Sequence, residues 1–512
     1  MKTRSFLLST LAAFMLAGCS SEEAGENNIP GDDLNGKAYL SLSLKSHTAI
    51  TRATTATKPG SEGESHAETV TVLLFDKDDV CLDVVDFNDA EVGNSGGEGN
   101  PTAAASEAKL VPEKSEKVFV VINPYSAGWD LSKDAVKGKP WNTINAAIDA
   151  TITNVTGDQN FMMASAGTPD AGALTDVKSN VVKVTPENEA TAKNQAKANP
   201  AIINVDRLSA KVEVAVKSPD FTKPEGSSFT FGGWELSVTN KSVKLYSDLI
   251  TYANATEGAV YRRDKNYLLG EQPTGGESAM DAAFDYLKNI DSNEETIPAV
   301  AQIAGASRYC LENTMDAEAQ KLGFTTKVVV KAQYTPKGID ANSSYFSWKG
   351  NYYTLEGLQK AYKETTGGGL KTDLPIFLKK AGIVEEGVLD IDKAIEELTT
   401  DKFNEKIGII GRFCAVRYYH SSVCYYDVLI RHDQAITTKM ALGRYGVVRN
   451  NWYHLELQSV SGPGTPWIPD PSDPDPTNPT PPDTDDDEAD AYLSVQITIN
   501  PWTFWTQGVD LH

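Results

Sequence analysis

Short apolar runs separated by turn-forming residues are the feature that most limits what this chain can fold into. Within each run, apolar and β-branched residues alternate with polar ones or stand together as in a buried strand, and Gly, Asp, Asn and Pro fill the intervals. The clearest runs are "ETVTVLLFD" at 68–76, "EKVFVVIN" at 116–123, "NVVKVTP" at 180–186, "DRLSAKVEVAV" at 206–216, "TKVVVKAQYTP" at 326–336 and "VVRNNWYHLELQSV" at 447–460. This pattern predicts an all-β-dominated fold with two β-sandwich domains in series, at 53–220 and 221–462.

Two parts of the chain depart from the β pattern. Residues 353–364 and 389–405 carry apolar side chains at helical spacing, which predicts a small helical insertion at about 345–405 in the second domain. Residues 463–490 are rich in Pro and Asp and cannot bury a core, so they are predicted to form an extended arm of polyproline II type. About 20 such residues at ~3.1 Å each would reach roughly 60 Å, enough to cross a domain.

Nearly the same strand occurs near both ends of the chain. "KAYLSLSL" begins at Lys37 and "DAYLSVQITI" begins at Asp490. Each predicts a β-strand with one apolar face. The apolar residues are Leu40, Leu42 and Leu44 in the first copy, and Leu493, Val495, Ile497 and Ile499 in the second, which continues to Trp502. Any half-buried strand has this pattern, so the pair by itself indicates no function.

The first residues have the pattern of a bacterial lipoprotein signal. Two basic residues precede an apolar run at 6–16, and Leu16-Ala17-Gly18-Cys19 matches the lipobox, whose cysteine is acylated after removal of residues 1–18. The acidic stretch at 20–23 is similar to the surface-export signal of Bacteroidetes lipoproteins. We therefore expect an outer-membrane lipoprotein that contacts the membrane only through its lipid, because no later segment has the ~20 apolar residues of a spanning helix.

Charge and cysteine content restrict the partners and the covalent structure. The formal net charge of −23 argues against nucleic acid or an anionic membrane surface as a partner, since either would repel the chain. Four cysteines follow Cys19, and in an oxidising compartment they could pair. Cys414 and Cys424 flank a potential turn and could form a disulfide, but buried free thiols remain equally open.

The sequence offers no motif that predicts an enzyme, a cofactor or a metal site. The G-x-S-x-G match at 93–97 lacks the preceding apolar strand and following helix of a nucleophile elbow. The six histidines include no pair at helical zinc-ligand spacing, and the acidic run at 483–490 lacks the spacing of a calcium loop. Carboxylates are so numerous that a glycosidase pair is neither indicated nor excluded.

Arg52 is the only arginine between Arg4 and Arg207, and it lies in the Ser/Thr-rich segment "SHTAITRATTATKPG" directly after the first strand. Flexible polar segments are where proteases cut, so the bond between Arg52 and Ala53 is a candidate processing site. A solitary arginine in an arginine-poor half of the chain could also arise by chance.

Several further segments resemble one family. The lipobox, the early strand, the nearby arginine and the Pro-rich arm that leads to "AYLSVQITINPW" are together similar to the Bacteroidetes fimbrillins, the shaft subunits of type V pili. "FMMAS" at 161–165, "DRLSAKVEV" at 206–214, "YCLENT" at 309–314 and "GVVRNNWYHLELQSV" at 446–460 also resemble recurring segments of that family. "GNYYTLEGLQKAY" at 350–362 is similar to the minor-fimbria shaft type.

The resemblance implies transthyretin-like, Greek-key sandwich domains and an assembly route. An Arg-specific surface protease would cut after Arg52, releasing the lipidated propeptide at 19–52 with its strand at 37–45. Loss of an edge strand would leave an apolar groove with unpaired backbone groups, which is unstable in water. The C-terminal segment at 491–512 of a neighbouring subunit would fill this groove, with Leu493, Val495, Ile497, Ile499 and Trp502 as its buried residues and Leu40, Leu42 and Leu44 as the residues displaced.

The partners implied are identical neighbouring subunits in a homopolymer, anchor and tip subunits, the protease, and receptors on host or bacterial surfaces. The mature chain would lie in a cell-surface fimbrium. Two other functions stay open at this stage: a monomeric surface lipoprotein that binds glycans, which would keep both strands in its own fold, and a fimbrial anchor or tip subunit, which need not lose the first strand or donate the last.

Overall fold

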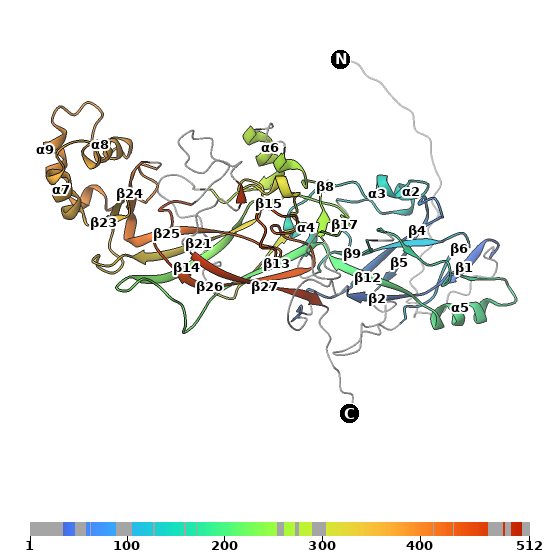
Figure 1. Cartoon of the computed structure of the whole chain (residues 1–512). Coiled ribbons are helices and arrows are strands. Elements are labelled where there is room, and N and C mark those ends of the chain that lie inside the picture. Colours follow the sequence, from blue (N-terminus) through green and yellow to red (C-terminus); the bar gives the residue numbers. More distant parts are fainter. Residues whose placement is uncertain are drawn as a thin grey trace, which may run out of the picture.

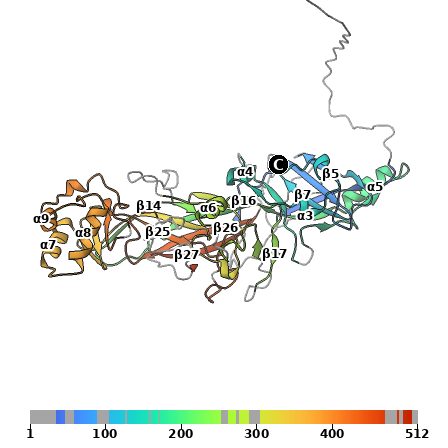
Figure 2. The same cartoon turned by 90° about the horizontal axis from the view of Figure 1, so that it is seen from above.

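The computed structural model describes residues 34–46, 58–61, 63–88, 105–125, 128–157, 160–169, 172–252, 261–271, 276–288, 304–412, 414–433, 435–468, 485–486 and 493–503. The molecule is elongated, with an N-terminal domain at one end, a C-terminal domain in the middle and a helical insertion at the other end (Figure 1). Viewed from above, the same three parts follow one another along the long axis (Figure 2). The fold is dominated by β-strands in sandwich domains, which confirms the predicted fold class.

The N-terminal domain packs a three-stranded sheet, ordered β11–β1–β6, against a seven-stranded sheet. The larger sheet has the order β2–β12–β9–β7–β4–β5, with β10 beside β7. These strands are β1 (Lys37–Leu40), β2 (Leu42–Ser46), β4 (Thr69–Phe75), β5 (Cys81–Asn88), β6 (Lys109–Pro112), β7 (Lys117–Ile122), β9 (Met163–Ser165), β10 (Thr175–Asp176), β11 (Val182–Lys183) and β12 (Ala201–Arg207).

Short helices cover the outer face of the larger sheet. They are α2 (Lys133–Val136), α3 (Trp141–Ile144) and α4 (Ile152–Thr156), while α5 (Glu189–Ala198) packs beside β1. Trp141 of α3 lies against Phe119 of β7, with ring centroids 4.4 Å apart. Because both faces of this sheet are covered, β4 and β7 read as nearly continuous apolar runs and not as alternating ones.

The C-terminal domain is a second sandwich. A five-stranded sheet, ordered β20–β13–β26–β27–β3, packs against a three-stranded sheet, ordered β14–β21–β25. Its strands are β3 (Lys58–Pro59), β13 (Ser209–Val216), β14 (Ser228–Ser237), β20 (Ser307–Leu311), β21 (Lys327–Thr335), β25 (Val423–Leu429), β26 (Asn451–Val460) and β27 (Leu493–Thr503). Trp234 of β14 and Tyr453 of β26 are fully buried between the two sheets.

The two domains interlock at their junction. β12 belongs to the N-terminal sheet and β13 to the C-terminal sheet, so the chain crosses between domains at Leu208, earlier than the boundary at 220 that the sequence suggests. Short elements around the junction add further links, because β16 of the C-terminal part pairs with β8 of the N-terminal part. These elements are β8 (Ile148–Asp149), β15 (Thr239–Asn240), β16 (Ser242–Val243), β17 (Asp248–Ile250), β18 (Tyr261–Arg263), β19 (Phe284–Asp285), α6 (Gly276–Ala283), η1 (Leu269–Glu271) and η4 (Ala317–Ala319).

The insertion forms a separate small core at the far end of the molecule (Figure 1). It contains β22 (Tyr345–Trp348), β23 (Asn351–Tyr353), α7 (Leu355–Glu364), α8 (Leu370–Lys380), α9 (Ile391–Glu396), η5 (Thr400–Lys402) and β24 (Val416–Tyr419), followed by η6 (His420–Ser422). Thr354 caps α7 by accepting a hydrogen bond from the backbone N–H of Gly357, at 3.1 Å. α8 is a helix that the sequence analysis does not predict, and it contains Pro375.

The described residues allow two expectations to be checked: a disulfide between Cys414 and Cys424, and the lack of a membrane-spanning helix. Cys81, Cys310, Cys414 and Cys424 are all buried and free. The potential Cys414–Cys424 disulfide is absent because the two side chains lie in different cores, one in the insertion and one in the C-terminal sandwich. Among the helices in the described ranges, none has the length and apolar character needed to cross a membrane.

A buried histidine supports the central strand of the C-terminal domain. Nδ1 of His432 lies 2.8 Å from the hydroxyl of Tyr453, which also accepts a hydrogen bond from the backbone N–H of Val448, so the hydroxyl donates to a neutral imidazole. Burial lowers the pKa of His432 to about 4 from its ordinary 6.5, although Asp433 and Glu312 oppose this shift. The folded protein therefore holds this histidine uncharged at neutral pH.

His432 predicts a loss of stability in acid. Between pH 6.5 and 4 the unfolded chain binds a proton at His432 that the folded chain does not, so this contribution falls as the pH drops, by about 3 kcal/mol in total. Burial raises the pKa of Asp264 to about 7, which acts in the opposite direction. Urea unfolding of the wild type and of His432→Gln at pH 7 and pH 4 isolates the contribution of the histidine. The difference in free energy of unfolding between the two proteins should be smaller at pH 4 than at pH 7. An equal difference at both pH values would contradict a lowered pKa of His432.

Candidate functional site

The strand at 37–46, made of β1 and β2, has backbone partners on both sides along β1 and a paired strand on only one side along β2. β1 lies between β11 and β6, antiparallel to both, and β2 runs parallel to β12. Where β1 passes into β2, the backbone N–H groups of Ser106 and Ala201 donate to the carbonyls of Leu42 and Ser41, at 2.7 and 2.8 Å. We call the groove formed by β6, β11, β12 and Ser106 the strand slot.

The sequence expectation of an edge strand holds for β2 and is wrong for β1. The chain passes from one sheet of the sandwich to the other at Ser41, so β2 is the outermost strand of its sheet while β1 is the central strand of the other. A central strand uses the hydrogen-bonding groups of both its edges. Any strand that replaces this one must therefore pair on both sides at the position of β1 and on one side at the position of β2.

The apolar face of the strand is buried, as the sequence predicts. Leu40, Leu42 and Leu44 are 2%, 2% and 7% exposed, and they pack in the core between the two N-terminal sheets. Each such leucine contributes about 1.5–3 kcal/mol on burial. The displacement of these three residues during assembly stays a prediction.

The opposite face is also buried, which the alternating pattern does not reveal. The hydroxyl of Tyr39 donates to Oε1 of Glu189 in α5 at 3.1 Å, and burial together with this carboxylate raises the pKa of Tyr39 to about 12. The hydroxyl of Ser41 donates to the backbone carbonyl of Ser106 at 2.7 Å, and Ser41 is fully buried. The serines in this strand are therefore internal groups with partners.

The C-terminal strand β27 lies on its own subunit, along the outer side of β26. Its register pairs Leu493 with Val460 and Ile497 with Leu455, in antiparallel orientation. Leu493 and Ile497 are 7% and 9% exposed, and Val495 packs against the same core. Ile499 and Trp502 belong to the strand, but their side chains lie outside the described residues.

β27 is supported less completely than the N-terminal strand. On the side away from β26, within the part of the chain that the structure describes, only its last two residues pair with a strand, as Trp502 and Thr503 meet β3 in parallel. In Figure 1, β27 and β2 both run along the lower side of the molecule, one on each domain. Because β3 follows shortly after the candidate cleavage site, this part of the chain contacts the end of β27.

The predicted lipidation and cleavage residues, Cys19, Arg52 and Ala53, lie outside the described residues. The segment that follows them is anchored at the domain junction through Glu64, which is 3% exposed. The Glu64 carboxylate accepts hydrogen bonds from Lys211 at 2.8 Å and from the hydroxyl of Tyr309. Burial alone would raise the pKa of Glu64, but these two hydrogen bonds lower it below its ordinary value.

Arg207 completes this anchor. Its guanidinium donates to the backbone carbonyl of Glu64 at 2.6 Å and to the hydroxyl of Ser65 at 2.9 Å. Arg207 and Lys211 stand at either side of the crossing between the two domains, so Glu64 and Ser65 in the segment at 63–65 tie both sheets together. Sequence reasoning missed this junction because Glu64 lies in the polar stretch "EGESHAE", which looks like solvent-exposed loop.

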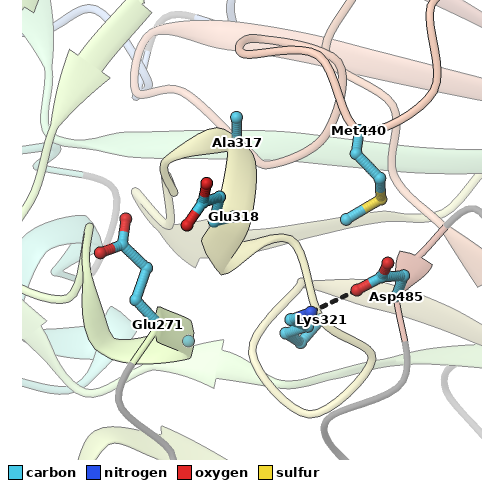
Figure 3. A pocket seen from close by; sticks show the side chains of 7 residues that line it. Glu271, Ala317, Glu318, Lys321, Met440 and Asp485 are labelled. Atoms are coloured by element: carbon cyan, nitrogen blue, oxygen red, sulfur yellow. Dashed lines mark hydrogen bonds and ion pairs between the residues drawn. The ribbon is translucent and has the colours of Figure 1, made fainter.

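Both described parts of the arm at 463–490 contact their own subunit. At its start Thr465 pairs with Tyr425, and Trp467 and Ile468 are buried, so the expectation that the arm contributes no buried residues is wrong there. Near its end, Asp485 and Asp486 make contacts as well. Asp486, 2% exposed, accepts a hydrogen bond from the hydroxyl of Thr325 at 2.5 Å, and its backbone N–H donates to the carbonyl of Gln320 at 3.1 Å. Asp485 forms an ion pair with Lys321 (Figure 3). These contacts border a pocket of about 500 Å³ that is also lined by Glu271, Glu318 and Met440. The sequence interpretation of 483–490 as solvated linker is therefore incorrect at these two residues.

The described residues offer no grouping of three or more His, Cys, Asp or Glu side chains that could hold a metal ion. The G-x-S-x-G match at 93–97 lies outside the described residues. His454 is partly exposed on the central strand β26, and its Nδ1 lies 3.4 Å from Oε2 of Glu213 on the neighbouring strand β13. The candidate functional features are therefore the N-terminal strand (β1 and β2), the C-terminal strand β27, and the anchored segment at 63–65.

Residues 417–508 match the family model described as "Major fimbrial subunit protein type IV, Fimbrillin, C-terminal". The chain carries a fimbrillin C-terminal region. The match spans β25, β26, the arm and β27, and it confirms the resemblance to the fimbrillins that the sequence predicts. A major fimbrial subunit is a structural protein, so the coarse prediction of a fimbrial subunit and not an enzyme agrees with the family.

The solved structures that match over most of the chain include fimbrial and cell adhesion proteins, all at low sequence identity. Fimbrillin FimA of Porphyromonas gingivalis W83 is 14% identical, with 92% of this chain and 98% of that chain covered and a TM-score of 0.38. The tip fimbrial protein Mfa3 of Porphyromonas gingivalis is 10% identical, covers 91% and 100%, and has a TM-score of 0.35. A candidate cell adhesion protein of Parabacteroides distasonis ATCC 8503 is 13% identical, covers 91% and 99%, and has a TM-score of 0.44. No curated protein matches the sequence.

Proposed function

We propose that this fimbrillin is a shaft subunit of a cell-surface fimbria that serves adhesion. The precursor is exported as an outer-membrane lipoprotein acylated at Cys19 and is cut between Arg52 and Ala53 by an Arg-specific surface protease. Subunits then polymerise by donor-strand exchange, with the C-terminal strand of one subunit replacing the strand at 37–45 of the next. Anchor and tip subunits end the polymer, and receptors on host or bacterial surfaces are its targets.

The observation that carries this proposal is the unequal support of the two similar strands. Along β1 the N-terminal strand has paired strands on both sides, whereas β27 is paired along its length with β26 and meets β3 only at its last two described residues. A strand that moves from an outer position into the slot gains backbone hydrogen bonds along this two-sided part, each with a net contribution of about 0.5–1.5 kcal/mol. The apolar side chains of the moving strand leave one buried site for another, because Leu493 and Ile497 are already buried on their own sheet.

Exchange between subunits favours an open chain of molecules. The slot lies on the N-terminal domain and β27 on the C-terminal domain, so donor and acceptor are different surfaces of one subunit (Figure 1). A contact between two different surfaces that does not close into a ring gives a filament. The Pro-rich arm beyond its packed start at 463–468 supplies the reach that a donated strand needs.

Removal of residues 491–512 tests the proposal. A chain that ends at Asp490 should still be cut after Arg52 but form no fibres, whereas a control chain that ends at Thr503, the last residue of β27, should assemble normally. Electron microscopy after protease treatment measures assembly, and circular dichroism checks that the shortened chain is folded. A synthetic peptide of residues 490–503 should also stop growth of wild-type fibres by filling open slots. Fibres from the chain that ends at Asp490 would contradict the donor role.

A further inference from the structure

The two terminal strands share one identical stretch of four residues. Ala38-Tyr39-Leu40-Ser41 in the N-terminal strand equals residues 491–494 in the C-terminal segment. Elsewhere the two strands agree only in apolar and polar alternation. Each of these four positions in the slot has its own size and chemistry, so the identity carries information that alternation does not.

The first two positions differ sharply in size. Ala38 is fully buried and pairs with Val111 of β6, in a site that holds only a methyl group. Tyr39 fits a hollow beside α5, where the small Ala192 and Ala196 leave room for its ring. Glu189 accepts the hydrogen bond from the tyrosine hydroxyl at the end of this hollow.

The next two positions differ in polarity. Leu40 packs in the apolar core, whereas Ser41 meets the polar atoms of Ser106. The Oγ atoms of Ser41 and Ser106 are 3.4 Å apart, and Oγ of Ser106 also accepts the backbone N–H of Leu42 at 2.9 Å. A large or charged side chain at Ser41 would have no solvent to reach, because this residue is completely buried.

We propose that the stretch Ala-Tyr-Leu-Ser is a register key for the incoming strand, an inference that rests on the proposed donor-strand exchange. The neighbour's residues 491–494 take the positions of residues 38–41, so Ser494 lies beside Ser106. Val495 and Ile497 then follow at the positions of Leu42 and Leu44. The occupant of the slot is thus a second copy of this chain in one defined alignment.

Alternation alone cannot define this alignment. A slip by one residue turns the apolar side chains to the wrong face, but a slip by two residues keeps every face correct. A slip by two in one direction brings Tyr492 to the position of Ser41, where no space exists for a ring. The opposite slip brings Gln496 to the position of Ser41 and leaves Glu189 without its tyrosine.

One departure from the first strand requires a local adjustment in the slot. In the proposed register Gln496 takes the place of the smaller Ser43, which is 4% exposed and whose neighbour in β12 is Ile202. Ile202 is 53% exposed, so the glutamine side chain has to extend over this exposed isoleucine for its amide to reach solvent.

Engineered cysteine pairs measure the register directly. Fibres of Ser106→Cys with Ser494→Cys should give a ladder of covalent multimers on non-reducing gels, because the matching serine oxygens lie 3.4 Å apart. Ser106→Cys with Tyr492→Cys, and Ser106→Cys with Gln496→Cys, report the two slips by two residues and should give no ladder. Fibres of wild type serve as the blank, since its four described cysteines are buried.

A charged residue within the stretch at 491–494 provides a second test of the proposed register. Ser494 is exposed on its own sheet, so Ser494→Asp should leave the monomer as stable as wild type. In the slot the same carboxylate would be buried beside Ser106, and fibre yield should fall about 100-fold or more. Thr498→Asp is the matched control, because it takes the partly exposed position of Lys45 and should assemble.

The outcomes separate this inference from the function on which it rests. Fibres that cross-link through residue 492 or 496, fibres that cross-link through none of the three, or normal fibres from Ser494→Asp would overturn the register while leaving exchange itself intact. Failure of the unmodified protease-treated protein to polymerise would instead overturn the proposed function. A ladder with Ser494→Cys only, together with loss of fibres in Ser494→Asp, supports the key.

Discussion

Replacing Arg52 with alanine is expected to leave a folded, secreted monomer that forms no fibres. As long as the chain is continuous, the strand at 37–45 is tethered to the anchored segment at 63–65. Its effective concentration at the slot is then on the order of millimolar, far above that of a neighbouring subunit in solution. The tethered strand therefore wins the competition for the slot, and only cleavage removes this advantage.

The Arg52→Ala variant is best compared with Thr51→Ala, which changes the adjacent residue and keeps the arginine. Both proteins are treated with an Arg-specific protease and inspected for fibres by electron microscopy, with mass spectrometry of the products. Thr51→Ala should be cut and should polymerise, whereas Arg52→Ala should do neither. Fibres of wild-type length and number from Arg52→Ala would show that strand removal at this bond is not what starts assembly.

Glu64→Ala is expected to produce the largest loss of stability among single changes near the candidate site. It removes the carboxylate that Lys211 and Tyr309 contact, and the Lys211 side chain is only 10% exposed. Breaking a buried ion pair by removal of one partner typically costs about 3–5 kcal/mol, because the other charge stays buried without compensation. The segment at 63–65 should then detach from the domain junction.

Lys77→Ala is the matched control for this prediction. Lys77 also forms an ion pair, with Asp78, but the two side chains are 71% and 67% exposed. Solvent screens such an exposed pair almost completely, so this variant should unfold almost like wild type. Urea unfolding followed by tryptophan fluorescence gives both values. A Glu64→Ala protein within about 1 kcal/mol of wild type would contradict the anchoring role.

The sequence predicts the β class and most long strands because their signal is local. "ETVTVLLFD" and "TKVVVKAQYTP" become β4 and β21 almost residue for residue, since a dense β-branched run has few alternatives. α8 escapes prediction because Pro375 reads as a helix breaker. Its apolar residues Leu374 and Phe377 nevertheless lie at helical spacing and pack into the insertion core.

The properties of the candidate site depend on contacts between distant residues, which a single sequence does not display. The buried face of Tyr39 and Ser41 is invisible in an alternating strand, because their partners, Glu189 and Ser106, lie far along the chain. The same holds for the burial of Glu64, which depends on Lys211 across the domain junction. The repeat of Ala-Tyr-Leu-Ser was visible in the sequence, but its meaning required the shape of each position in the slot.

The mass and N-terminal sequence of the protein in sheared surface fibres test the central claim most directly. The account predicts a mature chain that begins at Ala53, without the strand at 37–45, and that retains its C-terminal residues through Trp502. A fibre protein that still begins at lipidated Cys19 would contradict it, because the slot would then be filled by the subunit's own strand and could accept no donor.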